Sequence, residues 1–231
     1  MAAPSIHVEH IGEEGEPIVV VDGFAPDPDA LRAHAARQVF GSDDTYYPGV
    51  KARVPPTYFS GCETTLAVVL RDVFGHRAPP AVLGAWYQIV TTPPAALSPM
   101  QRLPHVDATG PAQVAMVHYL SHDDQGGTGF FRHRASGYET IDPARAKGFY
   151  AGLDAEVQRT PPLPVYLSDG APWFERIAAV APAYNRAVLY RSRLLHSGLI
   201  PPGASLSPDP ARGRLTVGCF FAADPGGRAA P

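Results

Sequence analysis

The sequence is poor in cysteine and in charge. It has two cysteines, Cys62 and Cys219, in 231 residues. Two thiols are too few for a disulfide framework or a cysteine-type zinc site, so we expect a reducing, cytoplasmic compartment. Charged residues make up 18% of the chain and the formal net charge is -3. Because there is no basic excess, we do not expect nucleic acid or an anionic membrane surface as a partner.

The chain also lacks a long hydrophobic run. No apolar stretch reaches the ~20 residues that a bilayer-spanning helix needs. The N-terminal sequence "MAAPSIHVEH" has no basic start followed by an apolar block, so we expect no secretory signal. Hydrophobic residues make up 45% of the chain, which is typical of a globular protein able to bury a sizeable core. At this length we expect one domain, residues 1–231.

Proline and glycine are abundant, with 26 and 22 residues, and this favours short strands and loops over long helices. The expected elements of the first part of the chain are a strand over residues 18–21, a helix capped by Asp27 or Asp29, a loop over residues 46–56, and a helix over residues 62–75 that ends at Gly75. We therefore interpret residues 1–80 as a helical support for the rest of the chain.

After about residue 81 the pattern changes to short apolar strands separated by turn residues. The predicted strands are "VLGAWYQIVT", "AQVAMVHYLS", "GTGFFRHR", "NRAVLYRS" and "GRLTVGCFFAA". An irregular insertion, helical in part, interrupts them over residues 138–181. The predicted fold class is mostly β with flanking helices (α+β), with a jelly-roll core of roughly eight strands over residues 81–224. Folds of this kind bind a small ligand in the mouth between the sheets.

Two potential metal ligands precede the second of these strands. His105 and Asp107 are two residues apart, so on a strand they would project to the same face. His196 follows a later apolar strand, far enough along the chain to return across the sheet. Two imidazoles and one carboxylate on one face form the facial triad of non-haem Fe(II) oxygenases, which leaves positions open for a co-substrate and O₂. The alternative is that none of the three binds a metal. H-x-D would then be a loop before a buried strand, and His196 would be an ordinary surface or core histidine.

A keto-acid co-substrate would need a cation for its far carboxylate. Arginine offers a planar, two-pronged grip that lysine cannot copy. In "PARGRLTVGCFFAAD" the residues Arg212, Arg214 and Thr216 alternate and so share a face. Arg214 with Thr216 could bind one carboxylate, and Arg212 is a competitor nearer the loop. The alternative is that both arginines are simply exposed at the start of a strand.

The order of these features resembles a known superfamily. H-x-D, then "VHYLS", "GGTGFFRH", a distal histidine and R-x-T before an aromatic strand are similar to the 2-oxoglutarate/Fe(II)-dependent dioxygenases, and within them to the prolyl-hydroxylase-like branch and a related bacterial group. The resemblance covers about residues 84–224. It implies a double-stranded β-helix (jelly-roll, cupin-like) core.

The resemblance also implies roles for individual residues. It makes His105, Asp107 and His196 the Fe(II) ligands, with 2-oxoglutarate and O₂ as co-substrates. Arg214 and Thr216 then bind the far carboxylate of 2-oxoglutarate, and Tyr119 in "HYL" hydrogen-bonds it. Gly126 and Gly127 would make the turn of the hairpin that follows. The sequence departs from the family pattern in the insertion over residues 138–181 and in an extra loop, "IPPGASLSPDP", between His196 and Arg214.

Other polar residues are better interpreted as structural. Arg132, His133 and Arg134 are typical of a charged hairpin rim, although one side of that strand could reach a cavity. We expect His118 to pack against the helices and the "SHDDQGG" segment to be a tight turn whose Asp side chains bond the backbone.

The predicted function is hydroxylation, or desaturation, of an aliphatic C–H group in a small molecule, an amino acid or a peptide side chain. The alternative is a non-catalytic jelly-roll protein that binds a metal or a ligand. The sequence leaves the substrate undetermined and a homodimer open.

Overall fold

The computed structural model describes residues 3–42, 46–77, 80–167 and 172–222. Within these residues there are three α-helices and ten strands, with two short 3-10 helices, Pro94–Ala96 and Pro99–Arg102. The helices are α1 (Pro28–Ala35), α2 (Glu63–Asp72) and α3 (Pro143–Arg159). The strands are β1 (Ser5–Ile11), β2 (Glu16–Asp22), β3 (Gly49–Arg53), β4 (Ala81–Val90), β5 (Gln113–Tyr119), β6 (Thr128–His133), β7 (Phe174–Val180), β8 (Arg186–Arg191), β9 (His196–Gly198) and β10 (Leu215–Ala222).

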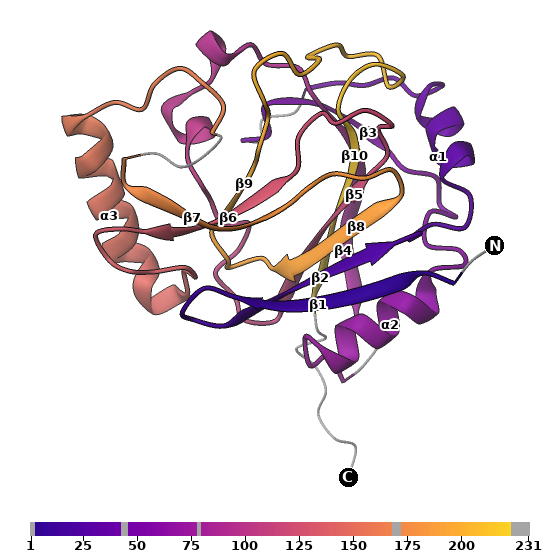
Figure 1. The fold of residues 1–231 in the computed structure, drawn as a ribbon, viewed down its shortest axis with the longest axis horizontal. Coiled ribbons are helices and arrows are strands. Elements are labelled where there is room, and N and C mark those ends of the chain that lie inside the picture. Colours follow the sequence, from indigo (N-terminus) through magenta and orange to yellow (C-terminus); the bar gives the residue numbers. More distant parts are fainter. Residues whose placement is uncertain (1–2, 43–45, 78–79, 168–171, 223–231) are drawn as a thin grey trace.

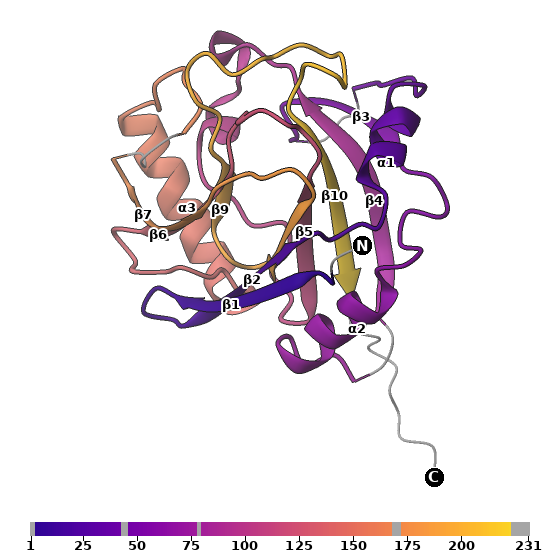
Figure 2. The same cartoon turned by 45° about the vertical axis from the view of Figure 1, so that its right-hand side comes forward.

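The described strands form two antiparallel sheets. The larger sheet has seven strands in the order β1-β2-β8-β5-β10-β4-β3, and the smaller has three in the order β7-β6-β9. Figures 1 and 2 show α1 and α2 beside the larger sheet and α3 beside the smaller one. The architecture is therefore mostly β with three helices, consistent with a β-sandwich or jelly-roll fold.

Three apolar clusters account for these layers. The first packs α1 and α2 against the outer face of the larger sheet, for example Leu31 and Leu70 with Val217. The second lies between the sheets and contains Tyr190 of β8 together with Phe130 of β6. The third packs α3 against the outer face of the smaller sheet. The central strands β5, β6, β8 and β10 thus bury both faces, which explains their nearly continuous apolar sequences.

Strand alternation decides which side chains of the larger sheet point between the sheets. Leu215 and Val217 of β10 belong to the cluster with the helices, so Arg214 and Thr216 face the other way. On β5 Met116 faces the helices, whereas Tyr119 lies in the cluster between the sheets. We call this side of the larger sheet its inner face.

The hairpin between β1 and β2 is locked onto the segment before α3. The buried carboxylate of Glu139 accepts hydrogen bonds from the backbone N–H groups of Glu13 and Glu14, at 2.9 and 3.0 Å. In return the Glu14 carboxylate accepts from Thr140 and from Arg145. Gly12, with φ of 66°, allows this approach, because a Cβ there would lie 2.1 Å from Oε2 of Glu139.

Several local predictions hold. Asp27 rather than Asp29 caps α1, and its carboxylate accepts from the N–H of Ala30 at 2.9 Å. Gly75 has φ of 77° just after α2, as expected of a residue that ends a helix. In the insertion α3 begins after Asp142, whose side chain accepts from the N–H of Arg145, with Pro143 in the first turn.

Other local predictions were wrong. Residues 46–56 were expected to be a loop, but β3 occupies the middle of this segment and forms an edge of the larger sheet. Residues 5–11 form β1, which was not predicted from the sequence because six of its seven residues are exposed and the strand has no buried face. Three strands therefore accompany the helices in the N-terminal part. In the insertion, β7 is the partner of β6 and belongs to the smaller sheet. None of the described helices is both long and apolar enough to cross a membrane.

Candidate metal centre and anion site

His105 and Asp107 are positioned by backbone pairing with the segment that leads to His196. The N–H of each histidine, His105 and His196, donates to the carbonyl of the other at 2.9 Å. The N–H of Asp107 donates to the carbonyl of Ser192, also at 2.9 Å. The expected strand for H-x-D is absent among the described elements; His105 forms an isolated β-bridge to His196 instead. This bridge extends the edge of the smaller sheet by one residue.

The three side chains converge. One donor atom from each of His105, Asp107 and His196 lies within 4.8 Å of the others. Nε2 of His196 is 3.4 Å from Oδ2 of Asp107, and Nε2 of His105 is 3.8 Å from Oδ1 of the same carboxylate. The side chains of His196 and Asp107 are 7% and 18% exposed, whereas that of His105 is 53% exposed. The group is therefore closed on the His196 side and accessible on the His105 side.

A backbone contact fixes the tautomer of His196. Its Nδ1 lies 2.9 Å from the carbonyl oxygen of Leu194, which can only accept, so Nδ1 carries the proton. The lone pair is then on Nε2, the atom that faces Asp107. Metal-binding histidines are commonly oriented by such a bond. The ring of Tyr190 packs against the same imidazole, with 4.6 Å between ring centroids.

Burial sets the charges of the group. Desolvation lowers the pKa of His196 to about 4, and the Leu194 hydrogen bond opposes this only partly. The pKa of His105 is also lowered to about 4, first by desolvation and then by the neighbouring His196. Burial raises the pKa of Asp107 to about 6. At neutral pH the group therefore consists of two neutral imidazoles and a carboxylate, the protonation states that a divalent metal requires.

Arg214 is buried on the inner face of the larger sheet, with 6% of the residue exposed. Its Nε and Nη2 donate to the carbonyls of Gly126 and Gly127, at 2.9 and 3.1 Å. Both glycines are required there, because Gly126 has φ of 96° and a Cβ on Gly127 would lie 2.0 Å from the carbonyl oxygen of Val180. Gly126 and Gly127, which the sequence predicted at a hairpin turn, thus orient the arginine through their carbonyl groups.

The two candidate arginines have different environments. The side chain of Arg212 is 77% exposed and pairs with Asp209 at 3.1 Å. Only Arg214 of the two faces the interior. Thr216 and Tyr119 are both buried and are paired across β10 and β5. The Tyr119 hydroxyl is 2.6 Å from Oγ1 of Thr128, and its ring lies 5.6 Å from the Arg214 guanidinium carbon.

Three tyrosines that were not predicted as site residues lie around this cation. The pKa of Tyr190 is raised well above its usual range, chiefly by burial and then by Asp107 and Tyr119, while Arg214 lowers it. Burial likewise raises the pKa of Tyr47, against the influence of Arg214 and a hydrogen bond with Thr216. Tyr166 donates to the carbonyl of Thr92 at 2.7 Å, and burial raises its pKa to about 12 although Arg214 lowers it. Tyr190 could have been found from strand alternation; Tyr47 and Tyr166 come from irregular segments with no periodic signal.

The remaining polar residues have structural partners. His118 is buried, lies 3.0 Å from the Tyr58 hydroxyl and contacts Phe24, as expected of a residue packed near the helices. His133 pairs with Glu156 of α3 at 2.9 Å. The partners of Arg132 and Arg134 are Glu139 and Glu175, and Asp124 accepts from the backbone of Gly126.

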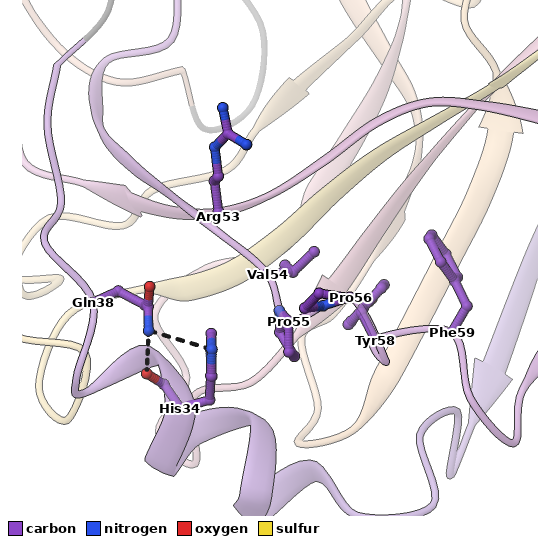
Figure 3. A pocket seen from close by; sticks show the side chains of 8 residues that line it. All are labelled: His34, Gln38, Arg53, Val54, Pro55, Pro56, Tyr58 and Phe59. Carbon is purple, nitrogen blue, oxygen red and sulfur yellow. Dashed lines mark hydrogen bonds between the residues drawn. The ribbon is translucent and has the colours of Figure 1, made fainter.

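Two hollows lie away from the three converging side chains. One, of about 430 Å³, lies where α1 faces the segment after β3 and is lined by His34, Gln38 and the segment from Arg53 to Phe59 (Figure 3). The other, of about 420 Å³, lies between α2 and the ends of β4 and β10. Both are on the helix side of the larger sheet. None of the three metal-ligand candidates lines either hollow.

Several solved structures are similar to this chain at low sequence identity. HygX from Streptomyces hygroscopicus, solved with nickel, 2-oxoglutarate and hygromycin B bound, matches with a TM-score of 0.50 and 14% identity over 90% of this chain and 83% of its own. AviO1 from Streptomyces viridochromogenes Tue57 has a TM-score of 0.48 and 16% identity over 91% and 90% of the two chains. An N-substituted L-amino acid dioxygenase from Burkholderia ambifaria AMMD has a TM-score of 0.42 and 15% identity over 91% and 83%.

The fold thus places the protein among β-sandwich proteins, and the likeness to HygX is one of fold. The chain belongs to the family of unknown function DUF6445, whose model matches residues 2–221. A search of curated protein sequences found no significant match.

Proposed function

We propose that the protein is an Fe(II)- and 2-oxoglutarate-dependent dioxygenase. The observation that carries this proposal is the convergence of His105, Asp107 and His196 within 4.8 Å. Arg214 supports it, since a buried cation lies on the inner face of the same sandwich. In proteins that bind iron this way, two imidazoles and one carboxylate leave half of the coordination sphere open.

We also propose that the core is a double-stranded β-helix. Such a core alternates between two four-stranded sheets as the chain proceeds. Here β4, β5, β8 and β10 lie side by side in the order β4-β10-β5-β8. The His105 bridge, β6, β7 and β9 supply the opposite sheet, in the order His105-β9-β6-β7. The chain crosses between these two sets at each step except from β6 to β7, which are neighbours in the smaller sheet.

The donor set fits a divalent iron. Both imidazoles are neutral near pH 7, and the tautomer of His196 is fixed by Leu194. A bound Fe(II) with 2-oxoglutarate and O₂ supplies an oxidant able to break an aliphatic C–H bond. The protein holds the three ligands in register, and Tyr190 and Phe130 keep water from the buried side of His196. Asp107 supplies a carboxylate ligand, and the presence of this ligand favours hydroxylation or desaturation over halogenation.

Arg214 would bind the far carboxylate of 2-oxoglutarate. Its guanidinium is pre-oriented by the carbonyls of Gly126 and Gly127, so little side-chain freedom is lost on binding. Thr216 and Tyr119 present hydroxyl groups on the same face. Asp107 raises the pKa of Tyr190 and Arg214 lowers it, so Tyr190 lies near both residues. This is expected if one end of 2-oxoglutarate binds at the metal beside Asp107 and the other end binds Arg214.

The experiment is an anaerobic titration of the apo-protein with Fe(II) and then 2-oxoglutarate. We expect a weak visible charge-transfer band that saturates at one equivalent of iron, followed by succinate on exposure to air. We expect the substrate to be a small molecule, an amino acid or a peptide side chain. We also propose that the protein is a single cytoplasmic domain and that it binds neither nucleic acid nor a membrane. No band and no succinate would favour the alternative, a non-catalytic protein of the same fold that binds a metal or a ligand.

A further inference from the structure

We propose that two copies of the chain associate through the edge strand β1 and thereby join their larger sheets into one. β1 stands at one end of the larger sheet, and β2 is its one partner among the described strands. Figures 1 and 2 show β1 at the lower border of this sheet. A second copy of β1 would pair with the backbone groups on its outer side. The proposal is independent of the metal centre and of the proposed oxygenase activity.

β1 is exposed on both of its faces. On the helix side of the sheet, Ile6 and Val8 are 43% and 39% exposed, although they are paired with Val21 and Val19 of β2. Both of these β2 valines belong to the apolar cluster that packs against α1 and α2, whereas Ile6 and Val8 do not. The helices therefore stop short of β1, and two apolar side chains continue the helix side of the sheet into solvent.

β1 lacks the usual features that protect the edge of a sheet from pairing. Its seven residues pair with β2 in a continuous register without a bulge. The strand sequence, SIHVEHI, contains neither proline nor lysine. The hairpin turn that follows is fixed by the Glu139 carboxylate, so the strand is already held in an extended form. Little conformational freedom is then lost when a second strand pairs with it.

The opposite edge of the same sheet has a different construction. β3 has five residues, which include Lys51 and Arg53, and it begins directly after Pro48. Gly41 bridges Lys51 on the outer side of β3 through two backbone hydrogen bonds of 3.0 and 2.8 Å. This edge is therefore short, charged and partly covered, and these features prevent pairing with another strand. Of the two edges of the larger sheet, only β1 is uncovered among the described residues.

The side chains of β1 fit an antiparallel pair about a two-fold axis at Val8. In this register all seven residues have a partner, and Val8 lies opposite the partner's Val8. His7 lies opposite the partner's Glu9, and the symmetry makes this contact twice. An imidazole N–H can donate to a carboxylate, and such complementary pairs stabilise neighbouring strands. Within the described part of the chain, neither His7 nor Glu9 has another side-chain partner.

Other antiparallel registers are less favourable. Because paired side chains must lie on the same face of the joined sheet, the partner of each residue can shift only in steps of two positions. A shift of two in either direction leaves five of the seven residues paired. It also places His7 opposite the partner's His7, or Glu9 opposite the partner's Glu9. Like charges directly opposite each other destabilise a strand pair, so the sequence of β1 favours the register centred on Val8.

The contact is small, so we expect a weak dimer. A pair of seven-residue strands buries less area than a stable interface needs, and a Kd of about 10–100 µM is expected. At the lower concentrations of an unfolding experiment the chain is then a monomer. Sedimentation velocity at concentrations on both sides of this range measures the association. Hydrogen exchange at the same concentrations shows where the copies meet: amides of β1 should become protected as the dimer forms, and those of β3 should not.

Matched variants test the pairing. Val8→Lys places two ammonium groups opposite each other on the axis and should raise the Kd at least about tenfold. Val39→Lys is the control and should leave the Kd unchanged, because Val39 follows α1 and is 93% exposed. His7→Glu should weaken association by like-charge repulsion. Adding Glu9→Lys to it should restore association, because the two charges are then exchanged. These positions are exposed, so each monomer should keep its stability, which urea unfolding checks.

Three results would overturn the proposal. The first is a chain that stays monomeric over the whole concentration range, whether or not a strand of another protein pairs with β1. The second is a dimer that Val8→Lys weakens no more than Val39→Lys does, or that leaves exchange at β1 unchanged, because the copies would then meet elsewhere. The third is a double variant of His7→Glu and Glu9→Lys that associates no better than His7→Glu alone, because the two residues would then not lie opposite each other.

Discussion

The phenol ring of Tyr190 lies against the imidazole of His196, with 4.6 Å between centroids and 55° between planes. Tyr190 belongs to the larger sheet and His196 to the smaller one, so this contact joins the two sheets at a proposed ligand. Burial is the main cause of the raised pKa of Tyr190; Asp107 raises this pKa further and Arg214 lowers it. The proposed metal half and anion half of the site therefore share one side chain between them.

The first prediction concerns His196. His196→Ala removes one imidazole ligand and opens a cavity beside Tyr190, and we expect it to abolish iron binding and succinate formation. Loss of one ligand of three should weaken metal binding by at least about 100-fold. Metal content after dialysis and the charge-transfer band measure this. His122→Ala, in the exposed turn after β5, is the control and should retain both signals. An iron-replete His196→Ala protein would remove this residue from the site.

The second prediction separates the two arginines. Arg214→Gln removes a buried cation, and we expect the Kd for 2-oxoglutarate to rise about 100-fold while Fe(II) still binds. The variant should also be less stable by about 1–3 kcal/mol, because the carbonyls of Gly126 and Gly127 lose their donors. Arg212→Gln should behave as the unsubstituted protein, since this side chain is on the surface. A 2-oxoglutarate titration of both variants measures this difference. Equal Kd values for the two variants would show that the interior position of Arg214 has no role in binding.

The sequence allowed much of the core to be predicted. The five strands β4, β5, β6, β8 and β10 stood out because their sequences are apolar runs between turn residues, as expected of strands in a packed core. Asp27 and Gly75 carried the usual signals for the ends of helices. His105, Asp107 and His196 could be predicted as metal ligands because the family resemblance assigns that role to residues at this spacing. No local sequence pattern indicates it.

What could not be predicted has physical reasons. β1 has no buried face, so its apolar residues Ile6 and Val8 remain exposed and give no clear amphipathic signal. β3 is five residues long and lies between proline-rich segments that are typical of loops. Tyr47 and Tyr166 reach the surroundings of Arg214 from irregular segments, and only tertiary packing brings them there.

The third prediction tests the lock between the β1–β2 hairpin and the segment before α3. Gly12→Ala should destabilise the protein by at least about 3 kcal/mol, because it adds a left-handed backbone cost to a clash with the Glu139 carboxylate. Gly15→Ala is the matched control. Its φ of 67° is nearly the same, but a Cβ there meets nothing within 4 Å, so it should cost only about 1–2 kcal/mol. Denaturant unfolding measures both, and equal losses would show that the Glu139 contact is not tight.

The fourth prediction is a pH dependence of stability that arises from Glu14. Burial alone would raise the pKa of Glu14, but hydrogen bonds from Thr140 and Arg145 outweigh it and hold the pKa below its usual value of 4.5. A carboxyl group with a lowered folded-state pKa stabilises the protein fully above the unfolded-state pKa, and this contribution is lost as the pH falls through the folded-state pKa. Glu14→Gln should therefore lower the free energy of unfolding by about 1 kcal/mol at pH 7, allowing for partial exposure of the pair.

Below pH 4.5 the difference between Glu14→Gln and the unsubstituted protein should shrink, because the protonated carboxyl group of Glu14 resembles the amide in charge. Urea unfolding across pH 3–7 measures this difference directly. Glu9→Gln, at an exposed position of β1, is the control and should show no such trend. A difference that stays constant down to the lowest pH would mean that the Glu14 carboxylate contributes through packing rather than through its charge.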